Sequence, residues 1–160
     1  MILRELHTTE IDCWIKEHHY LHSTPAGAVL RLEFLNDQNQ RVGGMMWGRP
    51  TSRKLDQQHL LQLTRMYFVD DTEPYAESKA LAMARKYIRK HLPRVKGLIT
   101  YASTGEHHEG TVYVADGWFE IQRTKGGGDW ESRAGRKNRD RSGKLSLIHI
   151  SEPTRLGMIS

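Results

Sequence analysis

The stretch that decides the fold is LLQLTRMYF (60–68), followed by VDDTEP (69–74), YAESKALAMARKYIRKHL (75–92) and GLITYA (97–102). The first segment is almost continuously apolar and β-favouring, which predicts a strand covered on both faces. In the third, Leu81, Ala84 and Ile88 form one apolar stripe, which predicts a helix that ends at Pro93. A strand, a helix and a strand joined by short connections predict two parallel neighbouring strands.

The helix over 75–92 begins next to acidic and turn-forming residues. We expect Pro74 in its first turn, with Asp71 or Thr72 capping its N-terminus or placing favourable charge there. Open α/β sheets bind ligands at the carboxyl ends of their strands. We therefore expect the polar residues of this unit to gather there: Arg65, Asp71, Ser78, Tyr101, His108 and Tyr113.

The segments around this unit complete a mixed sheet. Thr8 or Thr9 can cap a first helix whose apolar face is Ile11, Trp14 and Ile15. Residues 28–35 and 41–48 read as a hairpin around NDQNQ, and 119–124 read as a last strand after a short helix. The prediction is an α/β fold with a mixed β-sheet flanked by helices, forming one domain over 1–124.

Composition limits the class of protein. Of the 160 residues, 38% are hydrophobic and 27% are charged, as in globular domains. No long apolar run and no signal-peptide pattern occurs at Met1, so we expect a cytoplasmic protein that neither spans a membrane nor is secreted. The single Cys13 excludes an internal disulfide framework.

The positive charge is concentrated after the last predicted strand. The net charge is +5 and the pI is near 9.4, and the segment from Ile121 to Lys144 carries eight Lys or Arg against three Asp or Glu. A basic tail over 125–144 suggests a polyanion partner, most simply nucleic acid. The alternative is a solvated charged tail.

The last segment, LSLIHISEPTRLGMIS (145–160), differs from what precedes it. LSLIHISEPTR is the in-frame translation of a common transposon-type sequencing adapter. We therefore expect that the natural sequence stops near Lys144 and that the remaining residues are read-through. On that expectation, residues 145–160 do not belong to the fold. Source DNA without adapter sequence at this point would contradict it.

Histidines form the first cluster with chemical potential. His18, His19, Tyr20 and His22 are close in sequence, and His107 and His108 lie far along the chain. Imidazoles at this density can bind a metal or carry protons near neutral pH. No Cys pair or HExxH pattern favours zinc, and surface or capping histidines are the alternative.

The second cluster is Arg65 with Asp70, Asp71 and Ser78. An arginine at the end of a buried strand is usually paired with a carboxylate or bound to a ligand anion. Arg65 is therefore either part of a ligand site or one half of a salt bridge with Asp that only holds the loop. Ser78 can donate to an anion at the helix N-terminus or be an ordinary helix serine. The loop lacks the Gly-rich run that would cradle a pyrophosphate, which argues against a usual coenzyme A or nucleotide site.

The third cluster follows the second central strand: Tyr101, Ser103, Glu106, His108, Glu109 and Tyr113. It offers acids, bases and hydrogen-bond donors on one loop. No G-x-S-x-G elbow supports a nucleophilic serine, and Tyr113 and Trp118 can equally be core residues.

These motifs together resemble the Mom family of phage DNA-modification proteins. The resemblance rests on HHY (18–20), LTR (63–65), Ser78, the Tyr101-Ala102 pair, HEGTVYVADGW (108–118) and the basic segment SRAGRKNRDRSGK (132–144). It covers most of 14–144, and HEGTVYVADGW is its most specific part. One departure is Ser103, where many relatives have Asp; Asp71, Glu106 or Glu109 would then have to supply the missing acid.

The resemblance implies an acetyltransferase-like (GNAT-type) fold and transfer of a carbamoylmethyl-type group to adenine N6 in DNA, which shields phage DNA from restriction. It implies catalytic roles for Arg65, Ser78, Tyr101, His108 and Tyr113, and a pocket or metal role, with iron or another divalent ion, for His19 and Tyr20. The donor is then an acyl thioester or an aminoacyl-type molecule, in the cytoplasm of a bacterial host.

Double-stranded DNA is the partner that follows. The residues expected to contact its phosphates are Arg49, Arg53, Arg123, Lys125, Arg133, Arg136 and Lys137. Two alternatives remain open at this point: an acyl-CoA N-acyltransferase acting on another amine, and a DNA-binding protein without enzymatic activity. Self-association is a further possibility that the sequence leaves open.

Overall fold

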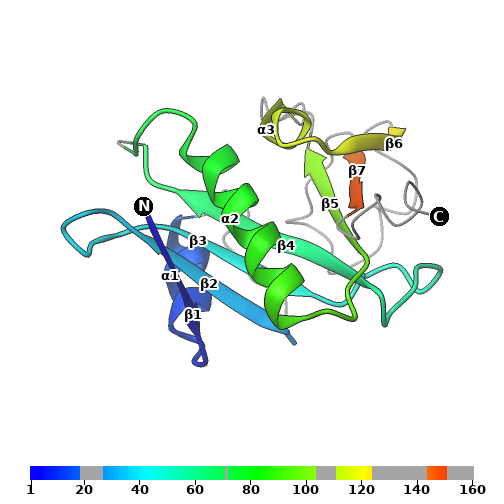
Figure 1. The fold of residues 1–160 in the computed structure, drawn as a ribbon, viewed down its shortest axis with the longest axis horizontal. Helices are drawn as coiled ribbons and strands as arrows, with labels where there is room; N and C mark the ends of the chain where they lie inside the picture. Colours follow the sequence, from blue (N-terminus) through cyan, green and yellow to red (C-terminus); the bar gives the residue numbers. More distant parts are fainter. Residues whose placement is uncertain (19–26, 71, 104–110, 124–143, 151–160) are drawn as a thin grey trace, which may run out of the picture.

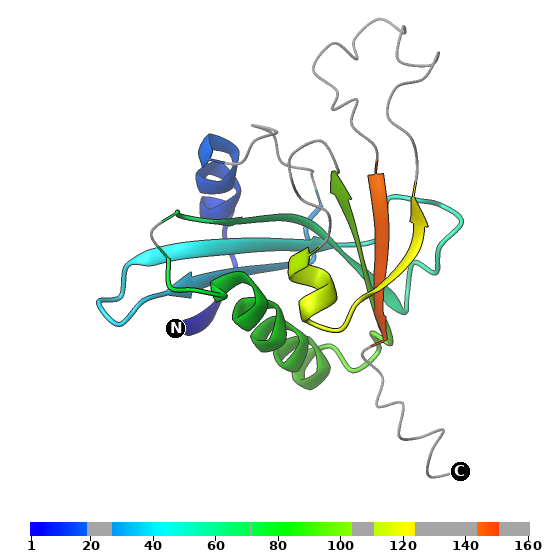
Figure 2. The same cartoon turned by 90° about the horizontal axis from the view of Figure 1, so that it is seen from above.

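A computed structural model describes residues 1–18, 27–70, 72–103, 111–123 and 144–150 of the chain. These residues form a seven-stranded sheet with the strand order β1-β2-β3-β4-β5-β7-β6 (Figures 1 and 2). The elements are, in chain order, β1 (Ile2–Leu6), α1 (Glu10–His18), β2 (Leu30–Leu35), β3 (Arg41–Gly48), β4 (Leu60–Phe68), α2 (Ala76–His91), β5 (Gly97–Ser103), α3 (Thr111–Ala115), β6 (Phe119–Arg123) and β7 (Lys144–Ile150).

The helices cover the two faces of the sheet unequally. Helices α2 and α3 lie on one face, where Ala80, Leu81, Ala84 and Ile88 of α2 are fully buried in the main core (Figure 2). Helix α1 lies on the opposite face over a smaller core of Ile11, Ile15 and Met46. Apolar stripes on both helices bury their surface against alternate residues of the same strands, as the sequence pattern predicted.

The predicted strand–helix–strand unit is confirmed as β4, α2 and β5, and its two strands are parallel as predicted. Strand β4 pairs in parallel with β5, whereas β1, β2, β3 and β4 are joined by antiparallel pairing. The hairpin of β2 and β3 and the helix α1 also lie where the sequence predicted them. The predicted mixed sheet flanked by helices is therefore present.

The predicted capping of α2 is wrong. The residue at its N-cap is Tyr75, which is in the left-handed region at φ 61° and makes no side-chain capping hydrogen bond. Pro74 therefore precedes the cap, and the Thr72 hydroxyl donates instead to the Val69 carbonyl in the loop before it. Asp71 lies outside the described residues.

Two strands were not predicted. Strand β1 pairs with β2 at one edge, and β7 lies between β5 and β6, pairing antiparallel with both. Residues 145–150 thus belong to the sheet, which contradicts the expectation that the fold ends before them; Leu147 is fully buried. The adapter origin of 145–160 is a separate matter and stays a prediction.

Candidate active site at the divergence of two central strands

Strands β4 and β5 pair over only part of their length. Their parallel pairing joins Leu60–Leu63 to Gly97–Thr100, and at the last rung the Thr100 hydroxyl donates to the Leu63 carbonyl at 3.3 Å. Beyond that rung β4 continues to Phe68 and β5 to Ser103, and the two strands diverge (Figure 1). Their carboxyl ends therefore open at the place where such sheets bind ligands.

Arg65 and Tyr101 follow directly after this divergence and share one face of the sheet. Arg65 is paired with Met46, whose side chain belongs to the α1 core, and cross-strand partners point to the same face. Tyr101 alternates with Leu98 and Ala102, which point into the main core on the α2 face. Both residues thus lie on the α1 face, one on each of the two diverging strands.

The two side chains have complementary chemistry. Arg65 is half-buried, and its Nη1 donates to the Thr64 carbonyl at 2.7 Å. Burial raises the pKa of the Tyr101 hydroxyl, so this group is protonated at neutral pH and acts as a hydrogen-bond donor. A cation and a neutral hydrogen-bond donor on the same face of the sheet suit a ligand with a carbonyl or anionic group.

Ser78 and Tyr113 lie on the other face. Ser78 is in the first turn of α2, and Tyr113, on α3, packs against the main core with its ring 5.4 Å from that of Trp118. The sheet separates these two residues from Arg65 and Tyr101. The four predicted catalytic residues that the structure describes are thus divided between the two faces of the sheet.

Several predicted residues lie outside the described part of the chain. These are His19, Tyr20, His108, Lys125, Arg133, Arg136 and Lys137, together with the acids Asp71, Glu106 and Glu109. Arg123 contributes backbone pairing to β6, opposite Leu145, and Ser103 is the last residue of β5. Arg49 and Arg53 are exposed in the loop between β3 and β4.

Sequence reasoning missed an aromatic group beside Arg65. Trp14 and His18 of α1 contact Tyr67 of β4, with ring centroids 5.0–5.5 Å apart in all three pairs. Two signals could have found it: Trp14 and His18 are four residues apart on one helix, and Tyr67 is two residues from Arg65 on one strand.

A second missed feature is a basic surface at the end of α2. Lys86, Arg89, Lys90 and Arg94 are exposed and make no ion pair with any residue that the structure describes. No acidic residue occurs in the sequence between Ser78 and Glu106. The Lys96 amide donates to the His59 carbonyl at 2.7 Å, which brings this surface to the same end of the sheet as the loop of Arg49 and Arg53.

The charges around the start of α2 decide whether a coenzyme A pyrophosphate fits there. Glu73 and Glu77 flank the first turn, and Lys79, the nearby cation, is paired with Glu73 at 2.9 Å. Acids at a helix N-terminus disfavour a second anion there, because they already occupy its positive end. The described residues therefore do not fit a pyrophosphate at this position.

Neither a cluster of metal-binding side chains nor a membrane-spanning helix is present among the described residues. They contain no group of three or more His, Cys, Asp or Glu that could hold a metal ion. No helix among them is long and apolar enough to cross a membrane. Because His19 and Tyr20 are not among these residues, the metal role implied for them stays a prediction.

Solved structures with the same arrangement are acetyltransferases. Mutant forms of the spermidine/spermine N-acetyltransferase SpeG from Vibrio cholerae align with 99% of this chain and 99% of their own, at a TM-score of 0.65 and 9% identity. NAA60 from Arabidopsis thaliana, solved in complex with acetyl-CoA, aligns over 93% and 98% at a TM-score of 0.64 and 9% identity. At such identity the likeness concerns the fold alone, and that fold is GNAT acetyltransferase-like.

Comparison of sequences identifies the family. Methylcarbamoylase mom from Escherichia phage Mu is 29% identical over 125 residues, which are 70% of this chain and 52% of the relative. The chain therefore spans about half the length of that curated relative. The sequence model of the Mom protein family matches residues 2–150, from β1 through β7. The chain belongs to the Mom protein family.

Proposed function

We propose that this protein is a DNA-modification enzyme that transfers a carbamoylmethyl-type group to adenine N6 and so protects the DNA from restriction. The observation that carries the proposal is the family match over 2–150, which spans both strands that hold Arg65 and Tyr101. The relative from phage Mu is named a methylcarbamoylase, and a transferase is the class of enzyme that its name and the fold together suggest.

The residues of the opening suggest how the transfer proceeds. With an acyl thioester or aminoacyl donor, a bond forms between adenine N6 and the donor's carbonyl carbon, the bond from that carbon to the thiol or hydroxyl leaving group breaks, and N6 loses one proton. The aminoacyl group so attached is an isomer of the carbamoylmethyl group, which a rearrangement of the attached group then forms. Arg65 binds a carbonyl or anionic part of the donor, and the protonated Tyr101 donates a hydrogen bond to it. His108 is the proposed proton acceptor, with Ser78 and Tyr113 reaching the donor from the other face.

The donor is an acyl thioester or an aminoacyl-type molecule in this proposal. The acids at the start of α2 do not suit the pyrophosphate of coenzyme A, so no step is derived through it. The fold itself supports a second candidate function, an acyl-CoA-dependent N-acetyltransferase acting on another amine. Binding of acetyl-CoA to the purified protein would favour that alternative.

Mass spectrometry of nucleosides tests the reaction directly. A plasmid is co-expressed with the protein, digested to nucleosides and searched for adenine heavier by a carbamoylmethyl group. The proposal expects this nucleoside with the wild type, both with this chain and with a natural C-terminal sequence in place of 145–160. Unmodified adenine from folded, soluble protein in both cases would contradict it.

Arg65→Ala tests the site. We expect loss of the modified nucleoside by at least about a hundred-fold, because a lost charge-assisted contact in a reacting site costs several kcal/mol. The fold and the affinity for plain duplex DNA should be retained, as measured by circular dichroism and by DNA titration. Arg53→Ala is the matched control, since Arg53 is exposed in a distant loop and should weaken DNA binding without abolishing transfer. Full modification by Arg65→Ala would refute the role of Arg65.

A further inference from the structure

The aromatic group Trp14, His18 and Tyr67 has no role in the transfer described above. The three rings contact each other at centroid distances of 5.0 Å for Trp14–His18 and 5.5 Å for each contact with Tyr67. His18 is exposed, and Trp14 and Tyr67 are half-buried, so the group retains accessible surface. The group lies on the α1 face, and Arg65 is close to it because Arg65 and Tyr67 are two residues apart on β4.

The helix that carries Trp14 and His18 packs tightly on the sheet. Ile11 and Ile15 are fully buried, and α1 can approach the sheet closely because Gly44 has no side chain; a Cβ there would lie 2.7 Å from Ile11 Cδ1. This close packing fixes the helix that carries Trp14 and His18. The rings are therefore pre-positioned, which reduces the entropy lost when a flat ligand binds.

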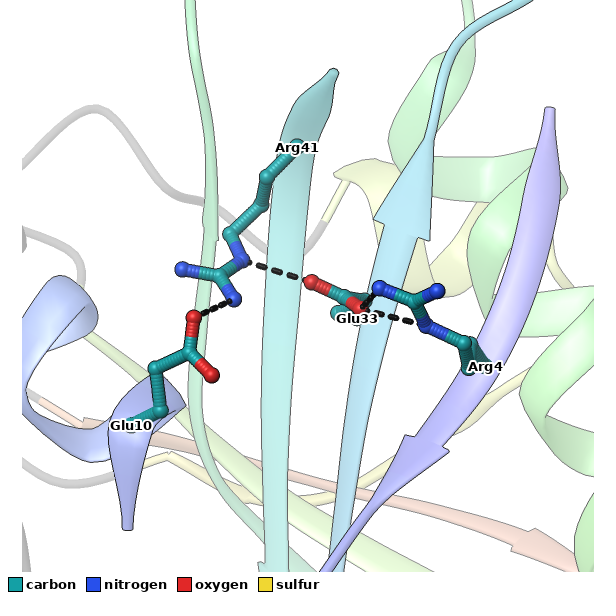
Figure 3. Close-up of polar contacts among 4 residues, drawn as sticks. All are labelled: Arg4, Glu10, Glu33 and Arg41. Atoms are coloured by element: carbon teal, nitrogen blue, oxygen red, sulfur yellow. Dashed lines mark hydrogen bonds and ion pairs between the residues drawn. The ribbon is translucent and has the colours of Figure 1, made fainter. Parts of the chain in front are cut away.

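A chain of ion pairs holds Trp14 from the side. The guanidinium of Arg41 lies 5.6 Å from the Trp14 ring centroid, in cation–π range. Arg41 donates to Glu10 at 2.6 Å and to Glu33 at 2.8 Å, and the buried Glu33 also accepts from Arg4 at 2.7 Å (Figure 3). Because Arg41 is held by two carboxylates, it is a fixed support for Trp14.

His18 adds a directional hydrogen-bonding group. Its Nδ1 lies 2.8 Å from the Trp14 carbonyl oxygen, which can only accept, so Nδ1 is the donor. In the neutral ring Nε2 is then an acceptor, and an exocyclic amine is a donor that it can receive. Aromatic faces with one such acceptor suit a purine carrying an amino group.

We propose that Trp14, His18 and Tyr67 form the stacking site for the extrahelical adenine that accepts the transferred group. The inference rests on the proposed function, because an enzyme acting on adenine N6 in a duplex must take the base out of the stack. The rings stack the base close to Arg65 on the face that also carries Tyr101, and His18 Nε2 accepts a hydrogen bond from the amine that reacts. The site recognises the base by stacking, separately from phosphate contacts.

Binding of two matched duplexes tests this site without any transfer. One duplex carries a single adenine opposite an abasic site, so the base is already unpaired; in the reference duplex an abasic site replaces that adenine as well. Base stacking on an aromatic side chain strengthens binding by about five-fold or more. We expect wild-type protein to bind the first duplex tighter by that factor.

Variants assign the effect to the rings. His18→Ala and Tyr67→Leu should bring the affinity ratio of the two duplexes towards one, while affinity for the reference duplex stays unchanged. Cys13→Ala, an exposed change on the same helix, should leave the ratio intact. A wild-type ratio near one, or a ratio unchanged in both ring variants, would overturn the proposal and leave the group a packing contact of α1.

The two proposals fail separately. If plasmid adenine is modified but the affinity ratio does not depend on the rings, the stacking site is wrong and the enzymatic function stands. If the ratio depends on the rings but no adenine is modified by the wild type, the protein binds an extrahelical adenine and the proposed transfer is wrong.

Discussion

At the scale of single residues, Asp116 explains part of the segment HEGTVYVADGW. Its carboxylate, with a side chain only 4% exposed, accepts two hydrogen bonds from Arg85, at 2.8 and 2.7 Å, and a third from Trp118 Nε1 at 2.9 Å. Arg85 belongs to α2, so this contact ties α2 to the turn after α3. The most specific part of the family resemblance thus includes a structural contact as well as candidate catalytic residues.

Arg85→Ala should destabilise the fold strongly. The change leaves the buried Asp116 carboxylate without its charge partner, and breaking a buried pair costs on the order of 3 kcal/mol. Urea denaturation measures the loss. Lys79→Ala on the same helix is the control, because its exposed pair with Glu73 contributes at most about 1 kcal/mol. Equal effects of the two variants would show that burial of Asp116 does not matter.

Glu33 should make stability depend on acidic pH. Burial acts to raise the pKa of this carboxyl, but hydrogen bonds and charge from Arg41 and Arg4 outweigh it and hold the pKa below 4.5. A carboxyl with a depressed pKa stabilises the fold above its unfolded value, and this contribution disappears as the pH falls through the folded value.

We therefore expect the free energy of unfolding to fall as the pH drops below 4.5, and to fall less in Glu33→Gln. Urea denaturation at pH 6 and at successively lower pH checks this. The exposed Glu73→Gln serves as the comparison, because Glu33 is 1% exposed and bonds to two arginines. An identical pH dependence of wild type and Glu33→Gln would contradict the expectation.

At the scale of elements, α2 has two different ends. Its first turn lies near acids, whereas its last turns carry Lys86, Arg89 and Lys90, and Arg94 follows just after it; these four have no ion pairs among the described residues. Part of this arrangement is favourable for the helix itself, because cations stabilise its C-terminus. Its position near the loop of Arg49 and Arg53 makes it a candidate for phosphate contacts as well.

Lys86→Glu with Lys90→Glu should weaken DNA binding uniformly across sequences. Each phosphate contact that is removed also lowers the slope of log affinity against log salt by about 1. DNA titration at several salt concentrations measures both effects. Comparison of the single variants Lys90→Glu and Lys16→Glu, the latter on α1, separates a local effect from that of net charge. A shift of equal size in these two single variants would assign the effect to net charge alone.

At the scale of the whole molecule, β7 lies between β5 and β6 and joins them into one sheet. Leu147 is fully buried in the main core, and β7 pairs along the whole of β5. Its removal would expose the edge of a central strand and separate β6 from the sheet.

Deletion of 145–160 should therefore destabilise the protein far more than deletion of 151–160, which leaves β7 in place. The measurements are the melting temperature and amide hydrogen exchange in β5. Equal stability of the two shortened chains would mean that β7 contributes little. Nucleoside analysis with a natural C-terminal sequence remains necessary, since the adapter origin of 145–160 is a prediction that sequencing of the source DNA decides.

The sequence by itself determined the elements whose signals are local. The apolar run of β4, the stripe of Leu81, Ala84 and Ile88, and the short connections predicted the parallel unit, and the motifs predicted the family. Strand β1 was not predicted because its five residues alternate weakly. The cap of α2 was predicted wrongly because capping preferences gave no sign that Tyr75 takes a left-handed conformation there.

Only the tertiary structure decided which side chains meet. Pairing with Met46 and alternation along β5 place Arg65 and Tyr101 on the same face of the sheet, while Ser78 and Tyr113 lie on the other face. It also placed Trp14, His18 and Tyr67 together, and inserted β7 between two strands that precede it in the chain. The physical reason is that periodicity fixes the face of an element through local geometry, whereas strand order and contacts across the sheet depend on hydrogen bonding and packing between distant segments.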